Sequence, residues 1–328
     1  MSLLTELKNQ IKEVNKPIKI VFAEGWNEDI QEAIKKVIKL SEEKITPILI
    51  FKNEKEASVS LPKQVVKIVI GKDDLKKYVD TIYEARKMKG ITREEAEAMS
   101  QKPFILAAAV VASGDADGEI CGIEYTTQDT IRGALQIVKA APGVKTVSSA
   151  FIMEKGERRL VMGDCAININ PDAENLASIA RSIAPFAVNV AKIKDPYIAL
   201  LSYSTAGSGK GESADKVRKA YEYISLDENF KSTYKIFGEL QFDAAYDVKV
   251  QNKKAKNLDW NKPANVFIFP NIDAGNIGYK IAQRLGDYQA IGPVVLGLNK
   301  PVKDLSRGAS CDDVIMLTLI TASQTLTK

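Results

Sequence analysis

The chain of 328 residues contains no histidine. This absence excludes the Ser-His-Asp triad, the Cys-His dyad, the HExxH zinc site and proton transfer by imidazole. Any acid–base chemistry must therefore use aspartate, glutamate, lysine, tyrosine or cysteine side chains.

Cysteine is also scarce, and the three cysteines form no CxxC pair: Cys121, Cys165 and Cys311. An odd number of widely separated cysteines predicts neither a disulfide framework nor a zinc site. We therefore expect a protein of the reducing cytoplasm.

An excess of charge of one sign is missing as well. Forty-six basic and 42 acidic residues leave a net charge of +4, which is too small to indicate a nucleic-acid partner. The N-terminus lacks the basic start and apolar stretch of a signal peptide. The longest apolar run, at 104–112, is about half of what a membrane-spanning helix needs, so we expect no membrane partner.

The length predicts two domains of roughly 150 residues each. In the first third, buried strands are expected at 18–22, 45–51 and 65–70, with a helix at 29–44 between the first two. Thr92 and Glu95 form a capping box that opens another helix. Strands that alternate with helices predict an α/β protein with mostly parallel sheets.

The middle of the chain departs from this alternation of strands and helices. Extended segments at 146–154 and 159–168 predict an antiparallel hairpin. Beyond it we expect strands at 198–203, 236–240, 266–269 and 291–296, helices from about 171, 213 and 274, and a last helix at 312–326 that packs back on the first domain. The expected domains are therefore 1–143 with 302–328, and 144–301.

A glycine-rich segment, LLSYSTAGSGKGES at 200–213, joins a buried strand to a helix. It is not a Walker A loop, because Ser204 and Gly211 stand where that motif needs Gly and Ser or Thr. It is not a dinucleotide fingerprint either, because Glu212 stands where the third glycine belongs. Two interpretations remain open: a tight connection that needs positive φ angles, or a phosphate cradle with Lys210 as a point charge.

Two other segments place an arginine near a helix start. Thr126 or Thr127 can cap a helix in which Arg132 lies one to two turns along, although a solvated surface arginine is the commoner outcome. Ser310 and Asp313 form a capping box that needs no functional explanation. That box leaves the preceding SRG sequence at 306–308 unexplained, and its hydroxyl, guanidinium and backbone donors suit a phosphate or an oxyanion.

Four segments together resemble the phosphate acetyl/butyryltransferase family: LLSYSTAGSG at 200–209, GELQFDAA at 238–245, FPNIDAGNIGY at 269–279 and KPVKDLSRG at 300–308. The resemblance implies reversible transfer of an acetyl group between acetyl-CoA and phosphate, giving acetyl phosphate and CoA. It also implies two α/β domains related to the isocitrate/isopropylmalate dehydrogenase fold, with an active site in the cleft between them. It further implies a homodimer, no metal in the chemistry and no permanently bound cofactor.

The same resemblance assigns roles to single residues. The catalytic residues of the family fall on Ser306, Arg307 and Asp313. Its substrate-binding arginines fall on Arg86 and Arg132. We assign further substrate contacts to Thr127, Ser204, Gly207, Gly209, Lys210 and Tyr279.

Three positions depart from the family pattern. Ala23 replaces a proline, Ile30 replaces an arginine, and Ala309 stands where the family often has cysteine. The first two weaken any assignment of site residues within 23–30, and they leave the C-terminal match untouched.

The expected chemistry needs a base that accepts the thiol proton, hydrogen-bond donors that stabilise the oxyanion, and groups that bind phosphate. Without imidazole, Asp313 is the candidate base. An ordinary aspartate carboxyl and a thiol differ by about 4.6 pKa units, or ~6 kcal/mol, so we expect either proton transfer concerted with attack or a thiolate stabilised by the arginines.

Four alternatives remain open at this point. One is covalent catalysis by Cys311. A second is a preference for propionyl or butyryl groups, because one methylene changes binding by only ~1–3 kcal/mol. The others are an NAD-dependent dehydrogenase of related fold and a non-catalytic protein that binds CoA or phosphate.

Overall fold

The computed structural model describes residues 1–326, and the chain divides into two compact units. Unit 1 comprises Leu3–Pro142 and the segment that begins at Leu298, and unit 2 comprises Gly143–Gly297. A bridge between Ala140 and Leu298 attaches the returning segment to unit 1. The chain therefore re-enters unit 1 slightly before the predicted crossing at 301/302.

Unit 1 contains a parallel sheet in the order β3-β2-β1-β4-β11. The first two predicted strands have the predicted bounds, and the third is shorter than predicted by one residue at each end. The strands are β1 (Ile18–Phe22), β2 (Ile45–Phe51), β3 (Val66–Val69), β4 (Gly118–Cys121) and β11 (Val302–Asp304).

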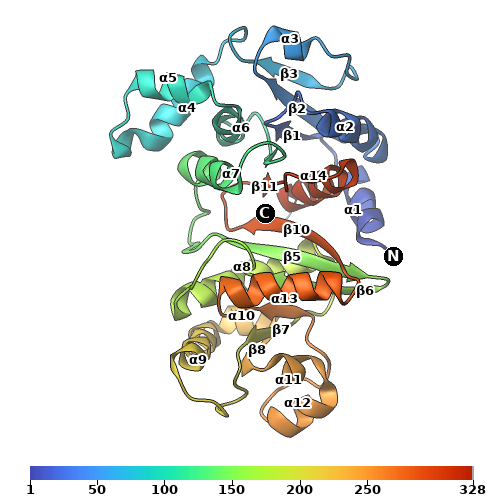
Figure 1. Ribbon diagram of the computed structural model, residues 1–328, viewed down its shortest axis with the longest axis vertical. Helices are drawn as coiled ribbons and strands as arrows, with labels where there is room; N and C mark the ends of the chain where they lie inside the picture. The colour runs from blue at the N-terminus through green and yellow to red at the C-terminus, as the bar shows by residue number, and fades with distance from the viewer. Residues whose placement is uncertain (327–328) are drawn as a thin grey trace. The chain divides into compact units, whose positions relative to one another are not determined.

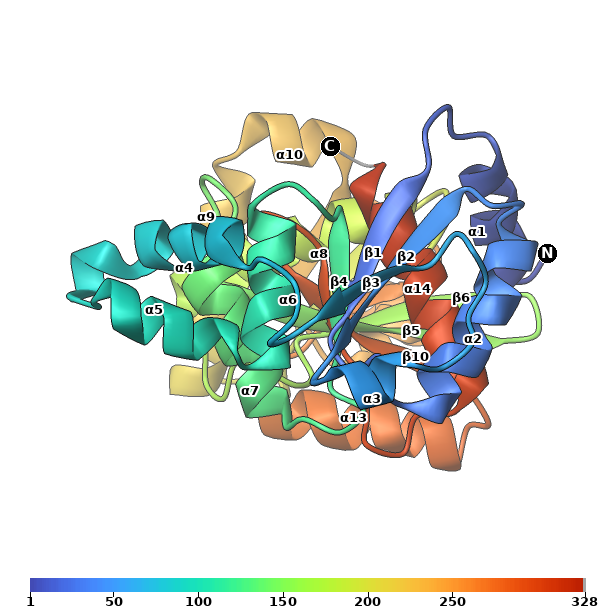
Figure 2. The same cartoon turned by 90° about the horizontal axis from the view of Figure 1, so that it is seen from above.

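Helices cover both faces of this sheet, as Figure 2 shows. α14 packs on α1, α2, β1 and β4, so the prediction that the last helix returns to the first domain is confirmed. α6 packs on β1, β2 and β4 from the opposite face, with α4 and α5 against it. The helices of unit 1 are α1 (Leu3–Lys12), α2 (Glu28–Leu40), α3 (Glu54–Ala57), α4 (Lys76–Arg86), α5 (Arg93–Ser100), α6 (Pro103–Ala112), α7 (Thr127–Gly133) and α14 (Cys311–Thr325), with short turns η1 (Lys87–Lys89) and η2 (Ala134–Val138).

Local sequence explains several helix starts. Both predicted capping boxes are present, at Thr92 with Glu95 and at Ser310 with Asp313. The apolar run 104–112 forms most of α6, which is buried on all sides because it lies between the sheet and the outer helices. Among residues 1–326, no helix combines the length and apolarity needed to cross a membrane.

β11 is a short strand that the sequence does not predict. Its three residues pair in parallel with β4. A strand this short has no usable periodicity of its own, and the existing edge of β4 determines its position.

Unit 2 contains a mixed sheet in the order β10-β5-β6-β9-β7-β8 (Figure 1). The predicted hairpin is confirmed as the antiparallel pair β5 and β6, while β6, β9, β7 and β8 run parallel. β10 is antiparallel to β5. The strands are β5 (Ser148–Lys155), β6 (Arg158–Gly163), β7 (Tyr197–Leu201), β8 (Lys235–Leu240), β9 (Val266–Ile268) and β10 (Gln289–Leu296).

Helices also cover both faces of the second sheet. α8 packs on β5, β6 and β9 and on its neighbour α9. On the other face, α13 packs on β10, β5 and β6, where Tyr279 stacks on Phe151 with a centroid distance of 4.0 Å. The helices are α8 (Ala173–Asn189), α9 (Glu212–Ser225), α10 (Glu228–Thr233), α11 (Phe242–Tyr246), α12 (Val248–Lys254) and α13 (Ile272–Arg284).

The predicted extended segment at 159–168 is too long. β6 ends at Gly163, and the next residue, Asp164, accepts backbone N–H groups from Ala166, Ile167 and Asn168. These hydrogen bonds fold the chain into a loop, because each N–H finds its partner within four residues rather than on a neighbouring strand.

Lys303 on β11 is fully buried, and its Nζ donates to Oε1 of Gln324. Burial lowers the pKa of Lys303 to about 7. The folded state therefore binds fewer protons than the unfolded state between about pH 7 and the ordinary lysine value of ~10.4. Stability consequently rises with pH across this window, and the penalty of the buried charge is complete below it.

We predict that Lys303→Met raises the free energy of unfolding at pH 6 by on the order of a few kcal/mol, and that the difference shrinks at pH 9. Urea unfolding of both proteins at the two pH values measures this. Lys39→Met, at an exposed position of α2, is the control and is expected to show no such trend. If the difference in unfolding free energy between wild type and Lys303→Met is the same at both pH values, the charge of buried Lys303 does not destabilise the folded state.

Candidate active site

The carboxyl ends of β1, β4 and β11 lie at one edge of the unit 1 sheet, because these neighbouring strands are parallel. This edge is where open α/β sheets bind their ligands. Three loops follow the strand ends, at 23–27, 122–126 and 305–310. They contain or lead into most of the site residues predicted for this unit.

The loop after β11 carries Ser306 and Arg307, and both are exposed. The N–H of Gly308 donates to Oγ of Ser306 at 3.4 Å, and the N–H of Ala309 donates to the Ser306 carbonyl at 2.9 Å. These contacts form a tight turn, so the hydroxyl and the guanidinium come from adjacent residues directly before α14.

Asp313 lies in the first turn of α14 and closes the capping box. Its Oδ2 accepts the Ser310 N–H at 2.9 Å and the Ser310 hydroxyl at 2.7 Å. The structure therefore gives Asp313 a structural role whether or not it also accepts a substrate proton. Its carboxylate is exposed and is separated from Arg307 by only one turn and the helix start.

Cys311, the alternative nucleophile, is the first residue of α14 and is half-buried. The ammonium of Lys36 on α2 donates to its Sγ at 3.6 Å. Cys121 and Cys165 are buried free thiols, and burial raises the pKa of each well above its ordinary value.

Glu24, at the end of β1, connects two of the three loops. Its Oε1 accepts backbone N–H groups of Gly122, Glu124 and Tyr125 at 3.0, 3.1 and 3.3 Å. Burial raises the pKa of Glu24 to about 7, although these three N–H groups act in the opposite direction. Glu24 has no role among the residues predicted from the sequence, and the signal that could have found it is a single acidic residue two positions after a buried strand.

Asp304 ends β11 and is almost completely buried. Burial raises its pKa, while hydrogen bonds with the side chains of Thr127 and Thr130 act in the opposite direction. Thr127, predicted to contact substrate, thus has a partner inside the protein. Thr126 is the residue that caps α7, accepting the Asp129 N–H at 3.1 Å.

The two predicted substrate-binding arginines differ in environment. Arg132, on α7, pairs with Asp129 and lies over the Phe104 ring at 5.9 Å, so an anion must compete with a carboxylate for it. Arg86 ends α4 and is half-buried, and its Nε is buried without a hydrogen-bond partner within the described part of the chain. An unpaired buried donor of this kind is costly unless a partner arrives.

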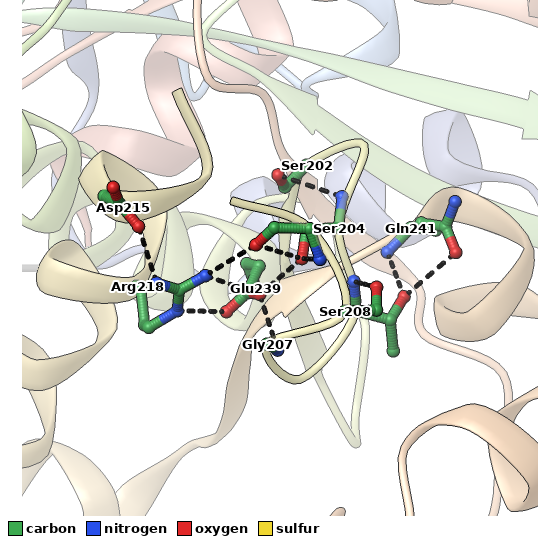
Figure 3. A network of polar contacts seen from close by, with 10 residues as sticks. Ser202, Ser204, Gly207, Ser208, Asp215, Arg218, Glu239 and Gln241 are labelled. Atoms are coloured by element: carbon green, nitrogen blue, oxygen red, sulfur yellow. Dashed lines mark hydrogen bonds and ion pairs between the residues drawn. The ribbon is translucent and has the colours of Figure 1, made fainter. Parts of the chain in front are cut away.

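In unit 2, the glycine-rich segment forms a closed loop between β7 and α9 (Figure 3). The Ser204 hydroxyl donates to Oε1 of Glu239 at 2.7 Å, and the Gly207 N–H donates to the same oxygen at 2.8 Å. The Gly209 N–H donates to Oγ of Ser204 at 2.8 Å. The donors of these three predicted binding residues are therefore engaged by Glu239 on β8 or within the loop, as the first interpretation of the segment expects. Lys210 is exposed at its end.

Glu239 is the centre of this network. Arg218 on α9 donates to Oε2 of Glu239 at 3.2 Å and to the Gly209 carbonyl at 3.2 Å. Burial acts to raise the pKa of Glu239, but the hydrogen bonds from Arg218, Ser204 and Gly207 outweigh it and hold the pKa below the ordinary value. The glycine-rich loop is thus fixed by an ion pair that the sequence analysis did not identify.

A third carboxylate, Asp164, organises the loop after β6. Besides the loop N–H groups it accepts the N–H and the hydroxyl of Ser149 on β5. Gly275 on α13 packs closely here, since a Cβ atom would lie 2.4 Å from the Asp164 carbonyl oxygen. Tyr279, one turn further along α13, is half-buried against Phe151.

Metal ligands are not grouped in residues 1–326: no cluster of three or more His, Cys, Asp or Glu side chains could hold a metal ion. What unit 1 brings together is a hydroxyl and a guanidinium in one turn, a carboxylate in the following helical turn, and an arginine-bearing helix at the neighbouring strand end. This set can bind an anion and accept a proton.

Comparison with known proteins identifies relatives over the whole chain. The chain is 46% identical over 329 residues to a phosphate acetyltransferase of Mycoplasma genitalium, covering 99% of this chain and 100% of that protein. It is 42% identical over 329 residues to a phosphate acetyltransferase of Bacillus subtilis, covering 97% of this chain and 98% of that protein.

Solved structures agree with these relatives. A phosphotransacetylase from Streptococcus pyogenes matches with a TM-score of 0.90 and 38% identity over 100% of both chains. A 4-hydroxythreonine-4-phosphate dehydrogenase, described as putative, from Salmonella typhimurium shares the fold alone, with a TM-score of 0.50 and 10% identity over 94% of this chain and 99% of that one.

The model of one protein family, described as "Phosphate acetyl/butaryl transferase", matches residues 2–322. Together with full-length relatives above 40% identity, this match shows that the chain belongs to the phosphate acetyl/butyryltransferase family.

Proposed function

We propose that this chain transfers an acetyl group reversibly between acetyl-CoA and phosphate, giving acetyl phosphate and CoA. One observation carries the proposal: Ser306 and Arg307 form a turn directly before the helix whose first turn holds Asp313, in a chain that matches phosphate acetyltransferases over its full length. The dehydrogenase alternative is supported by fold similarity alone.

In the direction of acetyl-CoA synthesis, the CoA thiol attacks the carbonyl carbon of acetyl phosphate. Arg307 pairs with the phosphate group, a role for which the planar guanidinium is suited. The Ser306 hydroxyl and nearby N–H groups stabilise the oxyanion. Asp313 accepts the thiol proton as the C–S bond forms, and collapse of the intermediate breaks the C–O bond and releases phosphate.

The remaining predicted residues have supporting roles in this proposal. Arg86 and Arg132 bind the anionic groups of the substrates, with Thr127 between Asp304 and the bound anion. In unit 2, Ser204, Gly207 and Gly209 shape the loop that presents Lys210, and Tyr279 contacts substrate. No permanently bound cofactor is required, and the three free thiols fit a reducing cytoplasm.

We further propose a homodimer formed through α13. This helix exposes Ile277, Ile281 and Leu285 at intervals of four residues, a stripe that is 52–82% exposed. The exposed Asp273 continues the stripe, and Arg284 flanks its other end. An antiparallel pairing of two α13 helices brings Asp273 of one copy near Arg284 of the other, so the stripe is complementary to itself in charge and apolarity.

The first prediction of the proposed function concerns the reaction itself. With acetyl-CoA as substrate, thiol release measured with a thiol reagent is expected only when phosphate is present. Arg307→Lys keeps the charge but loses bidentate pairing, and we expect kcat/KM for phosphate to fall about tenfold or more. Thiol release that does not depend on phosphate, or no thiol release at all, would contradict the proposed activity. Repeating the assay with propionyl- and butyryl-CoA determines the acyl preference.

The second prediction separates the catalytic and structural roles of Asp313. Asp313→Asn keeps an oxygen for the Ser310 N–H but cannot accept the thiol proton, so kcat should fall by about 10²–10⁴ with little change in the thermal midpoint. Ser310→Ala removes the cap and is expected to lower stability by about 1 kcal/mol with a much smaller effect on kcat. Near-normal turnover of Asp313→Asn at pH 7 would exclude Asp313 as the base.

The third prediction tests the dimer. Ile281→Asp is expected to halve the mass measured by light scattering, because it places a carboxylate in the middle of the apolar stripe while leaving the core intact. Met88→Asp, at a position in unit 1 that is 90% exposed, is the control and should leave the mass unchanged. A wild-type monomer, or a variant that keeps the dimer mass, would refute the pairing.

A further inference from the structure

We propose that Glu24 is a positioning residue for this reaction: its carboxylate fixes the loop between β4 and α7, and through it the side chains of Thr127 and Arg132. The inference rests on the proposed function, because only there do these two residues bind substrate. It concerns the segment 23–30, in which departures from the family pattern weaken the assignment of site residues.

The backbone around Glu24 is held on both sides. The N–H of Ala23 donates to the Ile120 carbonyl at 3.1 Å, and the N–H of Gly25 donates to the Ile50 carbonyl at 2.9 Å. Gly25 allows this approach because a Cβ atom there would lie 2.6 Å from the Ile50 oxygen. Glu24 is therefore attached through its neighbours to both β4 and β2, and its side chain leaves a rigid point of the sheet.

From this point the carboxylate reaches across to the loop after β4. One oxygen, Oε1, accepts three N–H groups of that loop, from Gly122, Glu124 and Tyr125. The side chain is fully buried, so these hydrogen bonds are not exchanged with water. No other side chain in the described part of the chain holds three N–H groups of this loop, and the direction of the loop thus depends on one carboxylate.

The shape of this loop is constrained by close packing at Gly122. Gly122 has φ +106°, and a Cβ atom there would lie 2.4 Å from Oδ1 of Asp304 and 2.8 Å from the Leu305 nitrogen. The Leu305 N–H in turn donates to the Cys121 carbonyl at 2.7 Å. A displaced loop would therefore disturb the residues directly before Ser306 as well as the cap of α7.

A second contact between the same two loops supports the arrangement. Trp26 Nε1 donates to Oε2 of Glu124 at 2.7 Å, and the Trp26 ring meets Tyr125 edge-on. Tyr125 also packs on Phe104 of α6. Because Glu24 acts on backbone N–H groups, its role does not depend on the substitutions at Ala23 and Ile30.

The test compares Glu24→Gln and Glu24→Ala with the wild type. Gln keeps an acceptor oxygen but loses the charge, and Ala removes the acceptor. Glu119→Gln is the matched control, because Glu119 is a fully buried glutamate on the adjacent strand β4 whose two oxygens accept no hydrogen bond within residues 1–326. It should leave both the loop and the kinetics unchanged.

We expect hydrogen exchange of the 122–126 amides to accelerate about tenfold in Glu24→Gln and more in Glu24→Ala, while β1 and β4 amides keep their protection. The same variants should raise KM for the anionic substrates about tenfold and about 100-fold, with smaller changes in kcat. A loss through general instability would instead accelerate exchange throughout unit 1.

Unchanged exchange of the 122–126 amides in Glu24→Gln would overturn the proposal. Accelerated exchange with unaltered KM would overturn it too, because the loop position would then not matter to the reaction. If the wild-type chain shows no phosphate-dependent thiol release, the proposed function fails separately, and the exchange measurement alone judges whether Glu24 holds the loop.

Discussion

Buried carboxylates that accept backbone N–H groups hold the loops at the carboxyl ends of the strands. Glu24 does this after β1, Asp164 after β6 and Glu239 near the end of β8. A loop that turns away from a parallel sheet leaves N–H groups without strand partners, and in the interior water cannot satisfy them. One carboxylate satisfies several at once, and those N–H groups in turn compensate the cost of burying its charge. The shape of each loop is therefore coupled to the ionisation state of the carboxylate that holds it.

The same principle separates the residues that build the site from those proposed to react. Each of these buried carboxylates accepts hydrogen bonds from the protein through at least one oxygen, and the donors of Ser204, Gly207 and Gly209 are also engaged within the protein. Ser306, Arg307, Lys210 and Asp313 are exposed. In the proposed function these exposed guanidinium, ammonium and carboxylate groups bind anions and accept the proton, because the chain has no histidine. The loop held by Glu239 carries Lys210, and the helix cap at Ser310 holds Asp313.

Patterns that depend on a few neighbouring residues were predictable. The strands β1 and β2, the hairpin of β5 and β6 and both capping boxes follow from residues adjacent in sequence. β11 was missed because three residues hold no periodicity, and the end of β6 was misplaced because Asp164 folds the following loop. The SRG turn at 306–308 stood out because the cap beside it left those residues unexplained, whereas Glu24 and Arg218 offered no local pattern at all.

The sequence by itself determined the chemistry that is possible: no imidazole, no disulfide framework, few arginines, two sets of alternating strands and helices, and family motifs in order along the chain. Only the tertiary structure decided which side chains are committed to the protein and which face solvent. Glu24 accepts N–H groups from residues about a hundred positions away along the chain. Glu239, near the end of β8, accepts the hydroxyl of Ser204, which follows the neighbouring strand β7. Such pairings arise from sheet order, because parallel neighbours bring distant strand ends together, and no local stretch of sequence encodes that order.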